Sequence, residues 1–344
     1  MSKLKKHSFT NSFTTESGFT FDKPEVAYHT WGTLNANKNN VILVIHALTG
    51  NSNIEDWFSG FFTENSPVNL DEHFVICMNL PGSCYGSLNP WSINPKSEKP
   101  YRGDFPVFTI RDVVRFQQLL LDELGVKNIE LVLGGSYGGM VALEFTIMDE
   151  RIKRACIVAM GKSHSPWAIG ISHAQRLALY ADPKWNNGFY DKKYPPADGL
   201  AAARAMAMIT YRSPENYEQK FGRNFNSEKK LFEVESYLEY QGEKLVDRFD
   251  ALTYDRLTKS MDTHDVSRDR GSFEDVLGNI KIPVLVMGIN SDKLYPTYEQ
   301  KELADLIPNA IYKEIKSVYG HDAFLIEFEQ INEALKKVFH FQSY

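Results

Sequence analysis

Cysteine is scarce in this chain, and the three residues that occur form no C-x-x-C pair: Cys77, Cys84 and Cys156. A disulfide framework and a zinc site are therefore both poorly supported, so we expect a reducing cytoplasm and no metal. Long apolar runs are also absent. The basic N-terminal residues are followed by Ser, Thr and Asn, and no run reaches membrane-spanning length. We expect neither a signal peptide nor a membrane partner.

The chain also lacks a surplus of basic residues. Its 38 Lys and Arg residues are outnumbered by 44 Asp and Glu residues, which gives a formal net charge of −6. Binding to nucleic acid or anionic lipid needs a strong positive field, so we expect neither partner. The length of the chain, in contrast, is large enough for more than one compact core. Because 344 residues exceed the usual size of one compact core, we expect one large domain with an insertion, or two domains.

One stretch, residues 129–145, combines an apolar strand, a sharp glycine turn and a helix. The turn reads Gly134-Gly135-Ser136-Tyr137-Gly138, and in this context a Gly-x-Ser-x-Gly pattern indicates a nucleophile elbow. Such a turn strains the serine backbone, so its neighbours must be small, as Gly134 and Gly138 are. Ser136 is therefore the candidate nucleophile. A structural serine in an ordinary glycine turn is the alternative.

Apolar runs and amphipathic stretches alternate on both sides of this elbow. We expect an antiparallel edge strand at residues 26–31, helices at 109–124, 298–306 and from 320 onward, buried strands at 41–45, 74–79 and 282–288, and further strands at 129–133, 154–160 and 310–315. This alternation predicts an α/β protein with a mostly parallel sheet and helices on both faces.

The alternation breaks between residues 163 and 272, where helical stretches rich in charges and aromatics replace the strand runs. Because the α/β pattern resumes afterwards, we interpret this part as a helical lid inserted over the sheet. A separate helical domain is the alternative. The predicted organisation is an α/β core of residues 1–162 and 273–344 with a lid of residues 163–272.

A serine hydroxyl needs a base within hydrogen-bond reach, and the order of residues along the chain selects one. In the α/β-hydrolase arrangement an acid and then a histidine follow the serine, each in a loop after a late strand. Asp292 and His321 occupy such positions, at the sheet edge where open α/β sheets bind ligands. We predict that His321 is the base and that Asp292 orients it. Asp265 and Asp322 are the alternative acids.

An oxyanion hole requires two backbone N–H groups aimed at the developing negative charge. We predict that Tyr137, directly after the nucleophile, supplies one of them. Leu48, in the loop after an early strand, supplies the other unless it only packs there. The other histidines considered receive no catalytic role: His46 is expected to be structural, and His164, His173 and His264 to be solvated or hydrogen-bonded on the surface. These residues alone indicate an enzyme of acyl transfer or hydrolysis.

Several stretches resemble the homoserine O-acyltransferase family of α/β-hydrolase enzymes. They include residues 27–35 (AYHTWGTLN), 46–50 (HALTG), 109–112 (TIRD), 174–176 (AQR), 209–211 (ITY), 247–250 (DRFD) and 320–325 (GHDAFL). The resemblance runs nearly end to end and includes the lid, which generic esterases do not share. It is therefore more specific than the elbow alone.

The resemblance implies a two-step reaction that needs no cofactor. Ser136 would take an acyl group, most often acetyl, from acyl-CoA, and the side-chain hydroxyl of L-homoserine would then accept it. In the family, an arginine and a tyrosine of the lid hold the carboxylate of the amino acid, and the aspartate after the catalytic histidine holds its ammonium group. The matching residues are Arg204, Tyr211 and Asp322. The resemblance also implies methionine biosynthesis and a homodimer formed through the lid helices.

The chain departs from the family pattern at three places. Leu88-Asn89 stands where a Thr-Gly pair is usual, in a loop expected near the acyl-enzyme side of the pocket, while His173 replaces a glutamate and Phe145 a tryptophan. These changes keep other substrates open, such as succinyl-CoA as donor or L-serine as acceptor. They also keep open a serine hydrolase that acts on a small ester or thioester.

Overall fold

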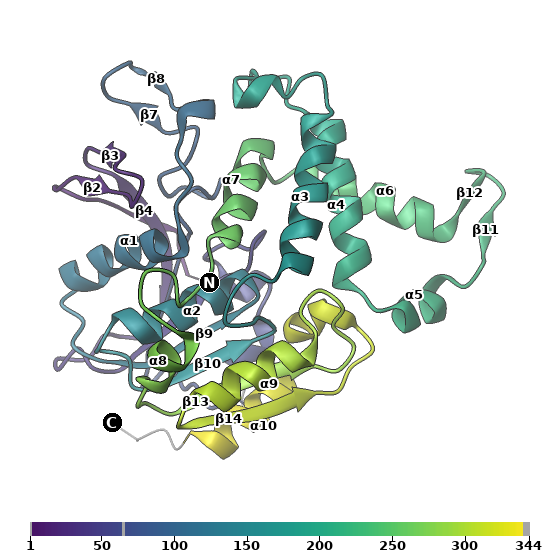
Figure 1. Ribbon diagram of the computed structural model, residues 1–344. Coiled ribbons are helices and arrows are strands. Elements are labelled where there is room, and N and C mark those ends of the chain that lie inside the picture. The colour runs from purple at the N-terminus through teal and green to yellow at the C-terminus, as the bar shows by residue number, and fades with distance from the viewer. Residues whose placement is uncertain (1, 64–65, 340–344) are drawn as a thin grey trace.

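The computed structural model describes residues 2–63 and 66–339, and a central eight-stranded sheet runs through it (Figure 1). The strands are β1 (Lys5–Ser8), β4 (Glu25–Trp31), β5 (Val41–Ile45), β6 (Phe74–Met78), β9 (Ile129–Gly135), β10 (Ala155–Val158), β13 (Val284–Ile289) and β14 (Ala310–Ile315). Their order is β1-β4-β6-β5-β9-β10-β13-β14, with β6 to β14 parallel and β4 antiparallel to both neighbours. The predicted mostly parallel sheet is confirmed.

Helices cover both faces of this sheet, as the alternation of strands and helices predicts. One face packs against α1 (Ile110–Glu123), α2 (Tyr137–Met148), α8 (Phe273–Gly278) and α9 (Thr297–Leu306), and the other against α10 (Phe328–Val338) and the short 3-10 helices η1 (Ile54–Asp56) and η2 (Ser59–Phe62). Successive strand residues face opposite sides, so Leu43 joins the first core and Val44 the second. Both faces of β5 are therefore apolar.

A helical segment connects β10 to β13. It contains α3 (Pro166–Tyr180), η4 (Asn186–Gly188), α4 (Ala197–Tyr211), α5 (Pro214–Phe221), the hairpin β11 (Phe225–Asn226) and β12 (Leu231–Phe232), α6 (Glu233–Val246) and α7 (Ala251–Asp262). Its two ends lie together, because Ser163 and Asp265 form an isolated antiparallel bridge. Figure 1 shows α5, the hairpin and the adjoining part of α6 projecting from the body as an arm. The bounds 163–272 given to the lid stay a prediction.

Two details differ from the sequence-based expectation. The strand at residues 26–31 is antiparallel, as expected, but it is not the edge: β1 pairs with its outer side. The turn Gly320–Leu325 is a separate 3-10 helix, η5, and the C-terminal helix begins only at Phe328. Gly320, the first residue of η5, has φ of 66°, a left-handed conformation that glycine adopts readily.

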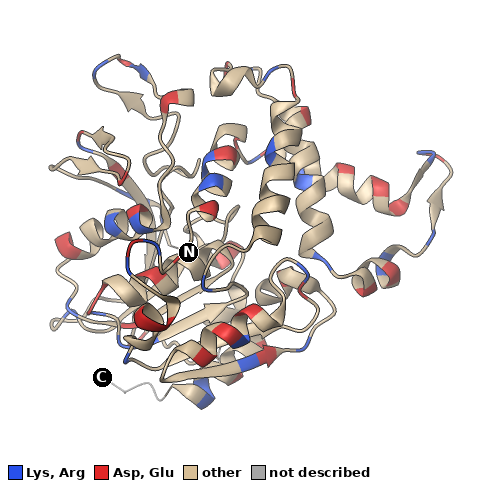
Figure 2. Ribbon diagram, in the orientation of Figure 1, with Lys and Arg blue, Asp and Glu red and all other residues tan. Residues whose placement is uncertain are grey.

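The remaining elements are short and peripheral. They are the hairpin β2 (Phe13–Thr14) and β3 (Thr20–Phe21), the hairpin β7 (Ile93–Asn94) and β8 (Lys99–Pro100), and the 3-10 helix η3 (Arg102–Asp104). Charges of both signs are spread over the outer helices in Figure 2, whereas the central strands carry few. Within the described residues, no helix has the length and apolar composition needed to cross a bilayer.

Candidate active site

Ser136 lies at the sharp turn between β9 and α2, and β9 is one of the central strands of the sheet. Its backbone has φ of 56° and ψ of −125°, a conformation that is strained for any residue other than glycine. The surrounding structure holds this strain, because the Ser136 N–H donates to the Val158 carbonyl oxygen at 3.0 Å and the Ser136 carbonyl accepts from the Met140 N–H at 3.1 Å. The strained elbow expected from the sequence is present.

The two flanking glycines are required by space. A Cβ atom on Gly134 would lie 2.1 Å from the carbonyl oxygen of Gly138, and one on Gly138 would lie 2.2 Å from the carbonyl oxygen of Ile45. In both cases the obstacle is backbone, which cannot move aside as a flexible side chain can. The sequence argument that these neighbours must be small is confirmed.

Replacing Gly138 by alanine should therefore destabilise the whole core. We expect Gly138→Ala to lower the free energy of unfolding by about 2 to 4 kcal/mol, because β5 or the elbow must shift to admit the methyl group. Gly170→Ala is the matched control, since Gly170 lies in α3 and a methyl group there would meet no atom within 4 Å. Urea unfolding of both variants measures the difference, and equal stabilities would contradict the close approach at Gly138.

His321 and Asp292 form the acid–base pair that their order along the chain predicts. Asp292 follows β13, His321 lies in η5 after β14, and His321 Nδ1 is 2.6 Å from Asp292 Oδ2. The other carboxylate oxygen, Oδ1, accepts the backbone N–H groups of Leu294 at 2.8 Å and Tyr295 at 3.0 Å. These contacts fix the carboxylate, and the carboxylate in turn fixes the imidazole ring.

The pKa of His321 is raised above its ordinary value. Burial alone would lower it, but the negative charge of Asp292 and its hydrogen bond act in the opposite direction, with a smaller contribution from Asp322. The His321 ring is also enclosed by Tyr295, at 5.3 Å between ring centroids, and by Phe324 at 5.5 Å. Its Nε2 atom has no hydrogen-bond partner among the described residues. That nitrogen is available to a reacting hydroxyl.

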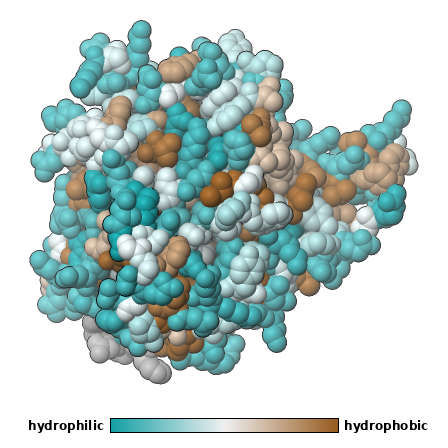
Figure 3. Space-filling view, in the orientation of Figure 1, coloured by the Kyte–Doolittle hydropathy of each residue, from teal (hydrophilic) through white to brown (hydrophobic). Residues whose placement is uncertain are grey.

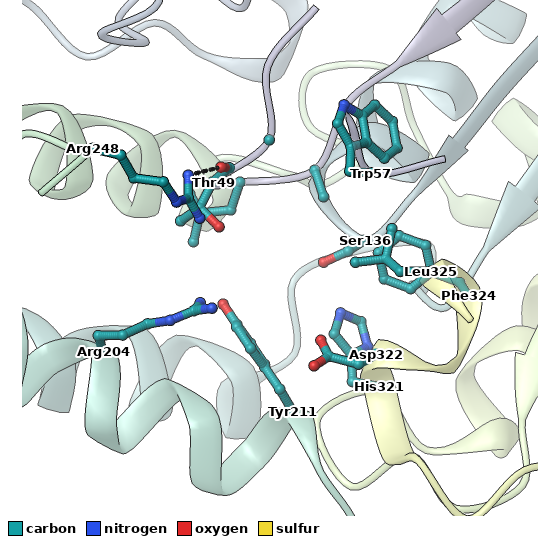
Figure 4. A pocket seen from close by; sticks show the side chains of 13 residues that line it. Thr49, Trp57, Ser136, Arg204, Tyr211, Arg248, His321, Asp322, Phe324 and Leu325 are labelled. Carbon is teal, nitrogen blue, oxygen red and sulfur yellow. Dashed lines mark hydrogen bonds between the residues drawn. The ribbon is translucent and has the colours of Figure 1, made fainter. Parts of the chain in front are cut away.

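Ser136 and His321 line one cavity of about 680 Å³. Figure 4 shows the Ser136 hydroxyl and the His321 ring on the same side of this cavity. Residues 47–50 line it as well, and Leu48 is among them. The backbone N–H groups of Leu48 and Tyr137 donate no hydrogen bond to any described residue, which leaves both able to meet a negative oxygen near Ser136.

Arg204, Tyr211 and Asp322 line or border the same cavity from the side of α4 and η5 (Figure 4). The Arg204 guanidinium lies 5.5 Å from the centre of the Tyr211 ring, and its Nε atom is buried without a hydrogen-bond partner among the described residues. The Tyr211 ring lies 5.7 Å from the His321 ring. The three residues that the resemblance predicts to bind the acceptor amino acid thus lie close to His321 and Asp292.

Asp322 does not compete with Asp292 for the histidine. It forms an ion pair with Arg212, with 3.1 Å between Oδ2 and Nε. Burial raises the pKa of Asp322 above its ordinary value, although the positive charges of Arg212 and His321 oppose this rise. The other alternative acid, Asp265, accepts hydrogen bonds from Ser267 rather than from a histidine.

Several residues in or beside the cavity were not predicted from the sequence. Arg212 follows Tyr211 directly, and Arg248 belongs to the family-like stretch DRFD, but the sequence predicted no function for either residue. Arg248 lines the cavity, and its Nη1 atom donates to the Thr49 carbonyl oxygen at 2.7 Å. Trp57 also lines it, and no local pattern in the sequence could have indicated that.

The expectation for two histidines is wrong. His164 and His264 are buried, not on the surface, and burial lowers the pKa of His164 to about 3 and that of His264 to about 4. His173 is exposed, as expected. His46 is structural, as predicted: its Nε2 atom accepts the Leu80 N–H at 3.1 Å, and burial lowers its pKa to about 4.

The loop of residues 81–90 does not lie where the sequence placed it. Leu88 is buried, and its N–H donates to the Glu25 carbonyl oxygen, whereas Asn89 lines a second cavity beside that of Ser136. No residue of this loop lines the Ser136 cavity. The Leu88-Asn89 departure therefore has no direct contact with the cavity of the candidate nucleophile.

Comparison with known proteins agrees with this geometry. The alpha/beta hydrolase fold family matches residues 40–328. The homoserine O-acetyltransferase of Chlorobium chlorochromatii is 51% identical over 325 residues, covering 93% of this chain and 91% of that protein. The chain belongs to the homoserine O-acetyltransferase family. It is therefore an acyltransferase-type enzyme of the alpha/beta hydrolase fold, as the resemblance implied.

Solved structures of this family and of related esterases have the same fold. The crystal structure of homoserine O-acetyltransferase from Bacillus anthracis superposes with a TM-score of 0.90 at 25% identity and covers 100% of this chain and 99% of that chain. An acetylester hydrolase from Corynebacterium glutamicum superposes with a TM-score of 0.87 at 26% identity and covers 98% of this chain and 95% of that chain. The fold thus occurs with both kinds of acyl acceptor, a hydroxy amino acid and water.

Proposed function

We propose that this protein transfers an acetyl group from acetyl-CoA to the side-chain hydroxyl of L-homoserine, in the pathway to methionine. The observation that carries the proposal is one cavity that holds a nucleophile with its base and also a separated cation and anion, Arg204 and Asp322. A zwitterionic amino acid needs such a pair, and a simple ester does not. The names of the relatives at about 50% identity support the same acceptor.

In the first step, Ser136 Oγ attacks the thioester carbonyl carbon while His321 Nε2 takes the hydroxyl proton. The negative oxygen of the tetrahedral intermediate is stabilised by the N–H groups of Leu48 and Tyr137. As the intermediate collapses, the carbon–sulfur bond breaks and His321 gives its proton to the departing thiolate sulfur, so CoA leaves as the thiol. The acetyl group is then bound to Ser136 as an ester.

In the second step, the homoserine hydroxyl attacks the Ser136 ester, and His321 accepts its proton. The bond to Ser136 Oγ breaks, the proton passes from His321 to Ser136, and O-acetylhomoserine leaves. Asp292 remains ionised throughout and stabilises the imidazolium formed in each step. The two substrates use one nucleophile in turn, so we propose ping-pong kinetics.

Release of the CoA thiol from acetyl-CoA, with and without L-homoserine, tests the proposed function. We expect fast release only with homoserine, together with one O-acetylhomoserine for each thiol. The alternative is a hydrolase that passes the acyl group to water, which the structural similarity to the acetylester hydrolase supports. Equal release with and without homoserine, with acetate as the product, would contradict the transferase. Succinyl-CoA and L-serine in parallel reactions test the other donor and acceptor.

We expect Arg204 to bind the acceptor, L-homoserine, and to have no part in the first step, the acylation of Ser136. We expect Arg204→Ala to raise the KM for homoserine by about 10- to 100-fold, because a charge-assisted hydrogen bond to the carboxylate is lost. Steady-state kinetics with each substrate varied in turn measures this effect. Arg223→Ala, which removes an exposed arginine of the arm, is the control. An unchanged KM for homoserine would refute the role given to Arg204.

We also propose a homodimer formed through the helical segment. The arm cannot cover its own apolar side chains, and Phe225 and Tyr240 are each more than half exposed. Figure 3 shows apolar surface along this arm. Sedimentation should give twice the chain mass of 39.3 kDa, and charged substitution of Phe225 should shift the protein towards the monomer. A monomer in the unsubstituted protein would contradict the dimer.

A further inference from the structure

A small cavity of about 330 Å³ adjoins the cavity of Ser136. It is lined by Arg204, Gln241, Lys244, Leu245 and Arg248, and it shares both arginines with the larger cavity. Figure 4 shows the guanidinium groups of Arg204 and Arg248 facing the cavity from two sides. The small cavity therefore extends the active-site cavity at the end formed by α4 and α6. We refer to Lys244, in α6, and Arg248, two residues after the end of α6, as the α6 cations.

The charge around this cavity is unbalanced. Three cations line it and no carboxylate does, although the whole chain has a net charge of −6. None of Arg204, Lys244 and Arg248 forms an ion pair with a carboxylate among the described residues. Elsewhere in the fold, arginines of the helical segment are paired, as Arg176 is with Asp262 at 2.6 Å. Uncompensated like charges that converge on one cavity favour binding of an anion.

The sequence of α6 separates its charges in space. Gln241 and Lys244 are three residues apart and so share one side of the helix, and Arg248 follows just beyond its end; all three line this cavity. The acidic residues Glu239 and Glu243 are four apart on another side and line no part of this cavity. Asp247, which caps the end of α6 beside Arg248, lines the second cavity instead, so no carboxylate of the described residues lines this one.

Arg248 is held in place while part of its hydrogen-bonding capacity stays free. Its Nη1 atom donates to the Thr49 carbonyl oxygen and to the Tyr85 hydroxyl, both at 2.7 Å. These bonds fix the guanidinium between the loop that contains Leu48 and the loop of residues 81–90. Its Nε and Nη2 atoms donate to no described residue, so they remain available to a ligand.

We propose that the α6 cations bind a phosphate group of the acyl donor, separately from the acceptor carboxylate at Arg204. The proposal rests on the proposed function, in which the donor is a CoA thioester. Such a donor carries its phosphates at the far end of a long, flexible, uncharged arm. When the thioester reaches Ser136, the arm must leave the cavity, and the exit at α6 offers cations without competing carboxylates. The planar fork of Arg248 and the compact ammonium of Lys244 both suit phosphate.

Lys244→Gln is the variant that tests the site, because Lys244 is exposed and, unlike Arg248, donates no hydrogen bond to the loop of residues 46–50 that contains Leu48. Two donors are compared: acetyl-CoA, and S-acetylpantetheine, which has the same thioester and no phosphate. We expect Lys244→Gln to raise the KM for acetyl-CoA about fivefold and to leave the KM for S-acetylpantetheine unchanged. The rise should shrink at high salt, since exposed charges are screened. Lys229→Gln, which removes an exposed lysine of the same segment, is the control.

Arg248→Gln extends the test to the residue that also donates a hydrogen bond to Thr49, in the loop that contains Leu48. We expect a rise in the KM for acetyl-CoA together with a lower kcat for both donors, because the bond to Thr49 is lost. The phosphate site is overturned if Lys244→Gln changes the two donors equally, behaves like Lys229→Gln, or raises the KM for homoserine instead. Failure of the unsubstituted enzyme to transfer acetyl from acetyl-CoA would refute the proposed function itself, which is a different result.

Discussion

Replacing Ser136 by alanine is expected to reduce acetyl transfer to homoserine by about 10⁴-fold or more. The loss should be this large because, in the proposed mechanism, Ser136 forms the covalent bond in the first step and is the leaving group in the second. The elbow holds the Ser136 backbone at φ of 56°, directly after the end of β9. Initial rates of thiol release and of O-acetylhomoserine formation measure the loss.

The control for this variant must separate lost chemistry from lost structure. Alanine removes only the hydroxyl, so Ser136→Ala should keep the thermal unfolding temperature of the parent enzyme. Ser97→Ala, at an exposed serine between β7 and β8, should keep both stability and rate. Turnover of Ser136→Ala within tenfold of the parent rate would mean that the acyl group passes directly between the substrates.

Replacing Asp292 by asparagine is expected to lower kcat by about 10³- to 10⁴-fold. The asparagine can still accept or donate one hydrogen bond, but it no longer fixes the imidazole with Nε2 ready to accept a proton. It also carries no charge to stabilise the imidazolium. The two backbone N–H groups of Leu294 and Tyr295, now bound by Asp292 Oδ1, hold the replaced side chain near its original place. The effect should therefore fall on kcat more than on folding.

The same variant should change the pH dependence in a defined direction. His321 must be neutral to act as a base, so activity falls as the pH drops through its pKa, which Asp292 raises. Without the carboxylate, burial dominates and the pKa of His321 falls, so the acidic limb of kcat should move to lower pH. Asp305→Asn, at an exposed aspartate of α9, should leave the limb in place. A limb that moves to higher pH in Asp292→Asn would contradict the assignment.

The positions of the strands along the chain could be predicted from the sequence, whereas their order in the sheet comes from the structure. The runs at residues 41–45 and 310–315 agree with β5 and β14 at both ends. The run at 41–45 is continuous because both faces of that strand are covered. Helix α1 begins where expected, because the Thr109 hydroxyl accepts the Asp112 N–H and the Asp112 carboxylate accepts the Thr109 N–H. Local composition determines these features, so a single sequence suffices to find them.

The candidate site was predicted best where chain order determines position. Ser136, Asp292 and His321 each follow a parallel strand at the same sheet edge, and a parallel sheet brings such positions together. The sequence could not reveal the partner of Asp322, because Arg212 reaches it from another element. It also could not reveal that His164 and His264 are buried, since their burial depends on how α3 and α7 pack.

The position of the loop of residues 81–90 also differs from the sequence-based expectation. The loop of residues 81–90 was expected beside the acyl-enzyme, yet its contact with the site runs through the Tyr85 hydroxyl and Arg248. The Leu88-Asn89 pair instead supports the neighbouring backbone, since the Leu88 N–H donates to the Glu25 carbonyl oxygen. If the α6 cations bind the donor as proposed, we expect donor selection to depend on the surroundings of α6 more than on this pair.

The central claim is that Ser136 carries the acyl group between the donor and L-homoserine. Mixing the enzyme with acetyl-CoA alone, quenching in acid and analysing the digested protein by mass spectrometry tests it most directly. We expect one acetyl group on the peptide that contains Ser136, and we expect added L-homoserine to remove that group as O-acetylhomoserine. An unmodified peptide, from an enzyme that consumes acetyl-CoA only when homoserine is present, would contradict the account.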